Sequence, residues 1–348
     1  MFKLKRKSLA LVLILMFSVV ALGGCGGTST EKKAETPAAP APAKQTEIIL
    51  GTAGAGGTWY VLGSGIANVI SKHNPDIKMT SSSTNGSVEN LRLVDQKRID
   101  IGMTQPPADF EAYTGIGLYK EGAPLKSLRY MCGGHYSIGQ LVVRADSNIK
   151  TIADLKGKKV AFGTVGSGTR HYVGRGLLRL AGLDMEDIQM VALNQDQGGD
   201  ALADGSVDAA MFSGGIPVPG LMNLAMTKDV RILPVPDGSV EKMKKEDPST
   251  GAAMKYFTVP AGTYKGQTKD ILTAGFITGF VVREDIPEET VYKILKTIDE
   301  YRSELVEIHP SGAEYTLETL ASGGAIPFHP GSLRFFKEKG ITVENPKI

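Results

Sequence analysis

Two short segments of the chain combine glycine with hydroxyl side chains in the same spacing. The first occupies residues 51–60 and the second residues 163–170, and each follows an apolar run and precedes a helical pattern. A strand, a glycine-rich turn and a helix start leave backbone N–H groups that can bind a polar or negatively charged ligand. Glycine also lets a ligand or a second backbone come close. The aligned positions are Gly51, Thr52, Gly54 and Gly56 in the first segment and Gly163, Thr164, Gly166 and Gly168 in the second.

Polar side chains beside these turns are the candidate ligand contacts. Hydroxyl and amide groups can form hydrogen bonds, and the Arg170 guanidinium can hold a carboxylate through two parallel bonds, unless it lies on a solvated helix face. Helix starts favour a bound anion. One residue of the pair Trp59 and Tyr60 is expected in the core, and Tyr60 is the better contact because its hydroxyl needs a partner. The predicted ligand site consists of Thr58, Tyr60, Ser87, Gln105, Thr164, Ser167, Thr169 and Arg170.

The sequence shows no arrangement typical of a catalytic or metal centre. None of the five histidines has metal-ligand spacing, and the Gly-Ser-Gly at 63–65 falls inside a helical pattern rather than after a strand. Trp59 stands where a dinucleotide fingerprint needs its third glycine, and the second segment lacks the lysine of a phosphate loop. We therefore expect no enzyme activity, no cofactor and no metal. His309 and His329, each followed by proline, are interpreted as surface or capping residues.

The N-terminal residues are typical of a secreted lipoprotein. Residues 1–24 combine a basic start, an apolar run and small residues, which together indicate a signal peptide. Because Cys25 follows the small residues directly, the segment resembles a bacterial lipobox, which implies that Cys25 carries the lipid. A soluble secreted protein with an incidental Cys25 is the alternative. Residues 25–46 hold no large apolar side chain and are expected to form a flexible tether.

Composition limits what the remaining chain can be. About 300 residues suit two domains. The signal segment contributes four basic residues and no acidic one, so its removal changes the net charge from +2 to −2. Such a balance argues against a nucleic-acid partner. Cys132 is the only cysteine after Cys25, so no internal disulfide is expected, and Cys132 is interpreted as a buried apolar thiol.

Strand patterns alternate with helix patterns along the globular part, and this order predicts an α/β fold with parallel strands. Residues 206–211 repeat the pattern of residues 98–103 with an offset close to that of the glycine segments, which indicates a duplicated domain. Residues 236–268 are expected to be irregular, and Ser87 is the expected N-cap of its helix. The predicted strands are 47–52, 77–82, 98–103, 128–132, 140–144, 159–164, 188–193, 206–211 and 271–283, and the predicted helices are 58–73, 87–97, 170–181, 198–204, 218–227, 288–307, 315–320 and 332–339.

Several of these segments resemble the TAXI family of TRAP-transporter solute receptors. The resemblance covers about residues 47–340 and keeps the order of the family's motifs. The first glycine segment, with its aromatic pair, is similar to the opening motif of the family. The other matching segments are 84–91, 100–105, 166–169, 260–264 and 329–331.

The resemblance implies a two-lobed periplasmic-binding-protein fold of type II, with two similar mixed-sheet domains and a ligand cleft between them. Lobe I would comprise residues 47–135 and 275–348, and lobe II residues 136–274. The implied ligand is a small organic anion, either a carboxylate or a glutamate-like amino acid. Arg170 and the prolines after Gln105 depart from the family pattern, and Arg170 favours a more acidic ligand.

The resemblance also implies an extracytoplasmic, monomeric receptor, anchored by lipid alone, that delivers its solute to a TRAP membrane subunit. Two alternatives within binding proteins stay open, a receptor for an ABC importer and a partner that presents ligand to a membrane sensor. An extracellular enzyme built on the same scaffold is a third alternative of a different class.

Overall fold

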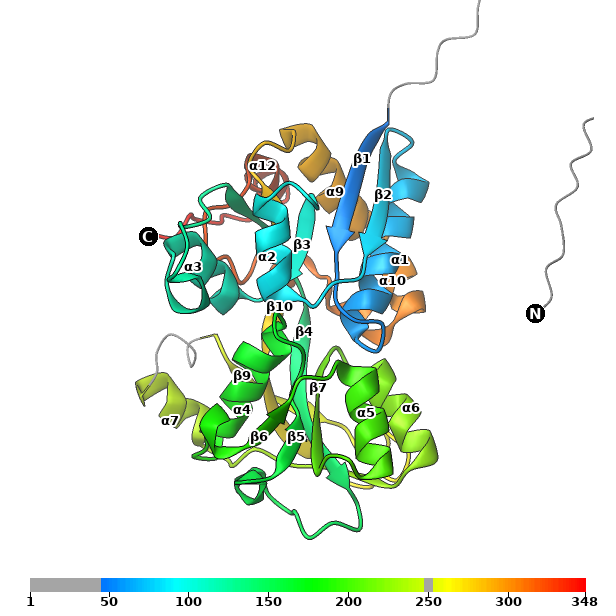
Figure 1. Ribbon diagram of the computed structural model, residues 1–348. Helices are drawn as coiled ribbons and strands as arrows, with labels where there is room; N and C mark the ends of the chain where they lie inside the picture. The colour runs from blue at the N-terminus through cyan, green and yellow to red at the C-terminus, as the bar shows by residue number, and fades with distance from the viewer. Residues whose placement is uncertain (1–44, 247–252) are drawn as a thin grey trace, which may run out of the picture. The chain divides into compact units, whose positions relative to one another are not determined.

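Apolar runs of the sequence form the strands of one mixed sheet in the computed structural model, which describes residues 45–246 and 253–348 (Figure 1). The strand order is β2-β1-β3-β10-β4-β7-β5-β6, with β8 paired to β4 and β9 paired to β10. The strands are β1 Thr46–Gly51, β2 Ile77–Ser82, β3 Ile101–Thr104, β4 Leu128–Arg144, β5 Lys159–Ala161, β6 Gln189–Val191, β7 Ala209–Gly214, β8 Val230–Ile232, β9 Lys255–Val259 and β10 Ile271–Arg283.

The helices pack around this sheet and are mostly close to the predicted ranges. Short 3₁₀ turns lie at Gly117–Tyr119, Ile152–Leu155, Met185–Asp187 and Pro310–Glu314, and a π-helix, η3, spans Thr169–Gly174. The α-helices are α1 Thr58–His73, α2 Ser87–Asp95, α3 Pro106–Thr114, α4 Arg175–Leu180, α5 Gln195–Asp204, α6 Pro219–Thr227, α7 Ser239–Glu246, α9 Glu288–Glu300, α10 Arg302–Ile308, α11 Leu317–Leu320 and α12 Pro330–Glu338.

The sheet has two halves of the same topology. In lobe I, the half around β1, that strand pairs in parallel with β2 and β3. In lobe II, the half around β5, that strand pairs in parallel with β6 and β7. The long antiparallel strands β4 and β10 run through both halves (Figure 1). The α/β two-lobed fold expected from the sequence is confirmed, and the repeated order of strands agrees with the two sequence echoes.

Strand β4 corrects one prediction. The sequence suggests two strands separated by Gly133 and Gly134, whereas the structure has one continuous strand. A Cβ added at Gly133 would overlap the Thr319 carbonyl oxygen, so this glycine allows the chain near α11 to approach β4. The pair of glycines therefore serves close packing rather than a turn.

Three further predictions differ from the structure. Residues 236–268 are not wholly irregular, because they contain α7 and β9. The helix expected at 288–307 is divided at Tyr301, whose backbone is not helical. The helix expected at 170–181 begins as the π-helix η3 and continues as α4. Of these elements, β9 forms because it pairs with β10. Its structure therefore depends on that partner strand rather than on its local sequence.

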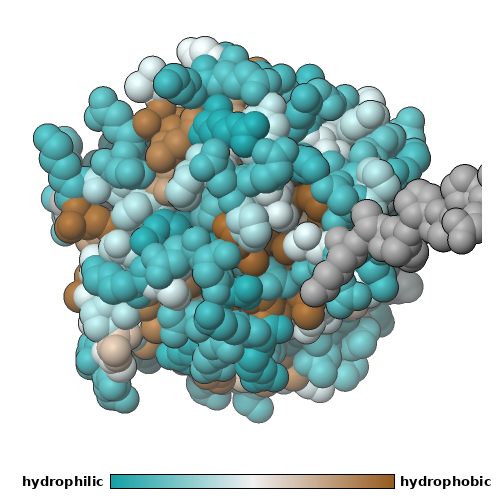
Figure 2. Space-filling model, turned by 90° about the horizontal axis from the view of Figure 1, so that it is seen from above, coloured by the Kyte–Doolittle hydropathy of each residue, from teal (hydrophilic) through white to brown (hydrophobic). Residues whose placement is uncertain are grey.

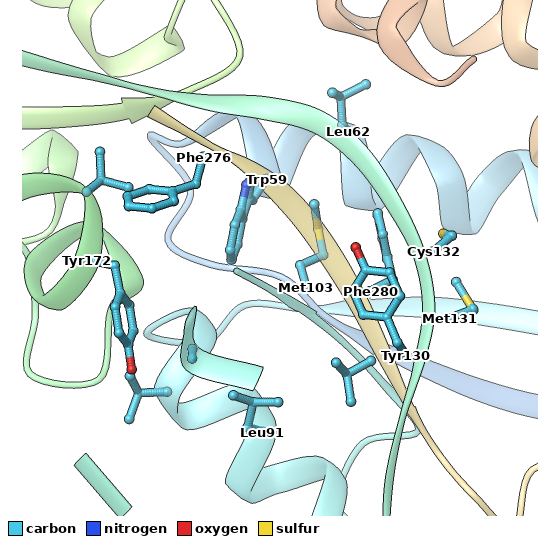
Figure 3. Packing of buried hydrophobic residues seen from close by; sticks show 14 of the residues in the cluster. Trp59, Leu62, Leu91, Met103, Tyr130, Met131, Cys132, Tyr172, Phe276 and Phe280 are labelled. Atoms are coloured by element: carbon cyan, nitrogen blue, oxygen red, sulfur yellow. The ribbon is translucent and has the colours of Figure 1, made fainter. Parts of the chain in front are cut away.

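Trp59 and several large side chains fill the space between the sheet and the helices. Trp59 is 7 % exposed, and its Nε1 donates a hydrogen bond of 3.0 Å to Thr278 Oγ1 on β10. Figure 3 shows its ring beside β10, with Phe276 on one side and Met103 and Phe280 on the other. Such burial is the main source of stability in a globular chain.

Figure 2 shows one face covered largely by hydrophilic side chains, with small separate hydrophobic areas. No helix among the described residues is long and apolar enough to cross a membrane. The predicted signal peptide at 1–24 and the lipid-bearing Cys25 lie outside the described residues, as does nearly all of the tether at 25–46.

Candidate functional site

A cavity of about 360 Å³ lies between the two glycine segments. It is located at the carboxyl ends of the parallel strands of both lobes, which is where ligands bind in open α/β sheets. Both lobes therefore contribute to one site. The lining comprises Ala53, Gly54, Gly57, Trp59, Ser83, Thr84, Asn85, Gly86, Glu89, Gln105, Ser137, Gly163, Thr164, Ser167, Gly168, Thr169, Asn194, Gln195 and Ser213.

Four residues predicted to bind ligand belong to this lining: Gln105, Thr164, Ser167 and Thr169. Gln105 directly follows β3, is the N-cap of α3 and is only 1 % exposed. Its side-chain oxygen has no hydrogen-bond partner. Since the fold does not use this amide, Gln105 can turn either its oxygen or its nitrogen toward a bound molecule. Its binding role stays a prediction.

The other four predicted residues lie outside the lining. Thr58 is buried, and its Oγ1 donates a hydrogen bond of 2.7 Å to the carbonyl oxygen of Gly215 in lobe II. Ser87 is fully buried, and its hydroxyl has no partner. Tyr60 is 37 % exposed, and Arg170 is partly buried without a partner for Nε. Thr58 therefore joins the two lobes, a role that its local sequence does not reveal.

Protein groups from lobe II occupy the starts of both lobe I helices at the cavity. The Gly166 carbonyl oxygen accepts hydrogen bonds from the backbone N–H groups of Val88 (3.1 Å) and Glu89 (3.3 Å) at the start of α2. Gly86, rather than the predicted Ser87, is the N-cap of this helix. A Cβ added at Gly56, just before α1, would overlap the carboxylate of Asp196 from lobe II. The Gly166 carbonyl oxygen therefore satisfies two N–H groups at the start of α2, whereas α1 has no side-chain cap.

Two helix starts of lobe II, those of α5 and η3, are capped from within that lobe. Asn194 Oδ1 accepts a hydrogen bond of 2.9 Å from the Gln197 N–H at the start of α5. Ser167 Oγ accepts one of 3.1 Å from the Arg170 N–H at the start of η3. Caps of this kind satisfy donors that would otherwise be free for an anion. The cavity therefore offers mainly side-chain hydroxyls and amides.

Two lining residues that the sequence did not single out, Asn194 and Gln195, come from the start of α5. The Gln195 side chain donates to the Ser213 carbonyl oxygen and accepts from the Ser213 N–H, both at 3.0 Å. This pair fixes Gln195 against the end of β7. The signal available in the sequence was the polar cluster that follows the predicted strand at 188–193. It does not by itself indicate a site, because the cavity forms only where these residues face the opposite lobe.

The electrostatics of the cavity differ from those expected. Of the described residues that line it, none is a lysine, an arginine or a histidine, and Glu89 is the one ionisable group. Glu89 Oε2 accepts a hydrogen bond of 2.6 Å from the Asn85 N–H. Close by, burial raises the pKa of Asp196 above its usual range and Asp200 adds to the increase, while a hydrogen bond from the Gly56 N–H opposes it. The site therefore has a negative rather than a positive bias.

The two histidine–proline pairs cap short helices, as one of the interpretations of the sequence proposed. His309 Nδ1 accepts from the Ser311 N–H and His329 Nδ1 accepts from the Gly331 N–H, both at 3.1 Å. Each Nε2 lies about 3 Å from a backbone carbonyl oxygen and donates to it. Cys132 is fully buried, and burial raises the pKa of its thiol, which agrees with an apolar role.

Several solved structures are similar to this chain. A ligand-binding component of an ABC-type import system from Staphylococcus aureus, described with zinc bound, matches with a TM-score of 0.51 and 12 % identity over 87 % of this chain and 94 % of that one. A protein from Bordetella bronchiseptica RB50 matches with a TM-score of 0.50 and 15 % identity over 86 % and 91 %. The alkanesulfonate-binding protein SsuA from Xanthomonas axonopodis pv. citri, bound to MOPS, has a TM-score of 0.46 and 18 % identity over 80 % and 85 %.

At identities this low, the likeness shows the fold alone. The fold is that of periplasmic binding proteins. A family assignment comes from the sequence, where the pattern of the NMT1-like family matches residues 50–340. The matched range contains both glycine segments, β4, β10 and every residue that lines the cavity. The chain belongs to the NMT1-like family.

Proposed function

We propose that this protein is an extracytoplasmic receptor that binds a small solute between its two lobes and delivers it to a membrane partner. The observation that carries the proposal is the cavity of about 360 Å³ lined by both lobes. This volume suits a small molecule. Gln105 adds support, because a buried amide without a partner lowers stability unless a ligand or water bonds to it.

The same proposal includes a closing motion. Lobe I would comprise residues 47–135 with 275–348, and lobe II residues 136–274, with β4 and β10 as the connecting strands. Besides the α2 cap, the lobes meet through a 3.0 Å bond from the Gly220 N–H to the Gly56 carbonyl oxygen and a 2.9 Å bond from Tyr172 Oη to Glu111 Oε2. These direct bonds would have to break for the solute to enter or leave, as in hinge closure around a ligand.

An ABC importer is the first candidate for the partner. The Staphylococcus aureus protein with the same fold is described as the ligand-binding component of an ABC-type import system. A TRAP membrane subunit is the second candidate and rests on the TAXI resemblance of the sequence motifs. Uptake of the solute into membrane vesicles distinguishes them, because ATP drives the first system and an ion gradient the second.

The organic-anion ligand implied by the resemblance has little support in the geometry. It depended in part on free helix starts and on Arg170, whereas the starts of α2, η3 and α5 are capped and Arg170 lies outside the lining. Anchoring through Cys25 belongs to the proposal as well. Mass spectrometry of the mature N-terminus tests it, since an unmodified Cys25 would contradict the anchor.

A thermal-shift screen of amino acids, amines, carboxylates and sulfonates tests the receptor function. A solute at 100 times its dissociation constant stabilises the protein by about 2.7 kcal/mol, which raises the melting temperature by a few degrees. If no solute raises it, the receptor function is contradicted. Consumption of the bound solute in a turnover assay would instead favour the enzyme alternative.

A further inference from the structure

The charge of the cavity lining restricts the class of solute. Glu89 on α2 is the one ionisable residue among the described lining residues, and the remainder are glycines, hydroxyls, amides, Ala53 and Trp59. A carboxylate or sulfonate entering this space would meet a like charge without a basic side chain to balance it. Like charges brought together in a partly desolvated site oppose binding.

Three helix starts at the cavity, those of α2, η3 and α5, are not free to compensate an anion. The start of α2 is occupied by the Gly166 carbonyl oxygen, and Asp196 lies against Gly56 before α1. Two further starts are capped by Asn194 and Ser167. Because these caps are parts of the protein, the favourable helix ends are already used.

The lining instead presents acceptors and an aromatic ring. One oxygen of Glu89 accepts the Asn85 N–H and so holds the turn before α2. The other oxygen forms no hydrogen bond with the described residues. The Gln105 amide is uncommitted and can present its oxygen. Trp59 uses its only donor on Thr278, so it offers only its ring to the cavity. A carboxylate, an amide oxygen and an indole ring are the groups that bind ammonium ions.

We infer that the solute carries an ammonium group and no net negative charge, with Glu89 as the main acceptor. This inference rests on the proposed receptor function. A zwitterion fits as well as an amine, because the lining hydroxyls of both lobes can bind its carboxylate through neutral hydrogen bonds.

Calorimetric titration with matched probes tests this class. The ammonium probes are alanine, 4-aminobutyrate and putrescine, and the probes without nitrogen are propionate, butyrate and succinate. At least one ammonium probe should bind, and its partner without nitrogen should bind at least about tenfold more weakly. Equal or tighter binding of the anions would overturn the inference while leaving the receptor function intact. If neither set nor the wider screen yields a ligand, the receptor function fails with it.

Glu89→Gln provides the matched variant, because an amide oxygen can still accept the Asn85 hydrogen bond. This variant should bind the best ammonium probe at least about tenfold more weakly, whereas Glu121→Gln, at an exposed site, should change the affinity less than about twofold. An unchanged affinity of the Glu89→Gln variant would overturn the role of this carboxylate. Equal melting temperatures without ligand confirm that the variant folds.

Discussion

The two glycine segments share their spacing but use glycine for different physical reasons. In lobe II, Gly163 and Gly166 have φ values of 78° and 153°, which side chains rarely adopt. In lobe I, no glycine between 51 and 57, all within the described chain, has a positive φ. There a Cβ at Gly51 would overlap Ile99, and one at Gly56 would overlap Asp196. Backbone conformation therefore explains Gly163 and Gly166 in lobe II. Close approach explains Gly51 and Gly56 in lobe I, and also Gly168 in lobe II, where an added Cβ would overlap Ser87 and Gln105.

The strands that follow the segments differ between the lobes as well. β3 ends at Thr104, and Gln105 follows it as the N-cap of α3, which contains the fully buried Asp109. β7 contains Ser213 in the corresponding place, and the helix after it, α6, has no acidic residue. The duplicated topology thus carries different polar groups after the corresponding strands, and the buried carboxyl of α3 has no counterpart in α6.

Gly166→Ala gives the largest expected effect, because it strains the backbone and disturbs the carbonyl that caps α2. The free energy of unfolding should fall by about 2–3 kcal/mol, measured by urea denaturation. Gly157→Ala is the matched control, with a φ of 73° and no atom within 4 Å of an added Cβ. If both variants lose the same free energy, the Gly166 cap contributes nothing.

Asp109→Asn tests the buried carboxyl of lobe I. Burial raises the pKa of Asp109 to about 8, and the Thr104 hydroxyl opposes this only in part. The folded protein therefore holds a proton that the unfolded chain releases near its ordinary value of 3.8, so the wild type loses stability as pH rises from about 4 to about 8. The variant should be more stable than the wild type at pH 7 by about 1–2 kcal/mol, with the difference vanishing near pH 4. A variant that is less stable at pH 7 would contradict this.

Gly56→Ala examines the close approach in lobe I and should have the smallest effect, about 1 kcal/mol, because the Asp196 side chain can move. Adding Asp196→Ala should restore most of the loss, which a double-mutant cycle of unfolding free energies measures. Strictly additive effects would show that Gly56 is needed for another reason. No such rescue is expected for Gly166, whose cost lies in its own backbone.

Periodicity predicted most of the elements, because apolar runs and helical spacing are local. α1, β2 and β10 span the predicted residues, 58–73, 77–82 and 271–283. The break predicted at Gly133 was wrong. This glycine is needed because the chain near α11, which is distant in sequence, packs against β4 there. Local pattern therefore locates elements better than it explains a glycine.

The candidate site was predicted in part for a similar reason. Gln105 directly follows β3, and Ser167 lies in the turn between β5 and η3. The sequence pattern predicted both positions, and both residues line the cavity. Thr58 was assigned to the ligand, yet it bonds to Gly215 of the opposite lobe. Contacts between lobes leave no local signature, so the sequence could not separate residues that bind a solute from residues that join the lobes.

Calorimetric titration of the best solute from the screen, on the wild type and on Gln105→Ala, tests solute binding between the lobes most directly. We expect one solute per chain and an affinity at least about tenfold lower for the Gln105→Ala variant. The Gln96→Ala variant, changed at an exposed site, should bind the solute with the affinity of the wild type. Equal affinities in all three proteins would place the solute outside this cavity and contradict solute binding between the lobes.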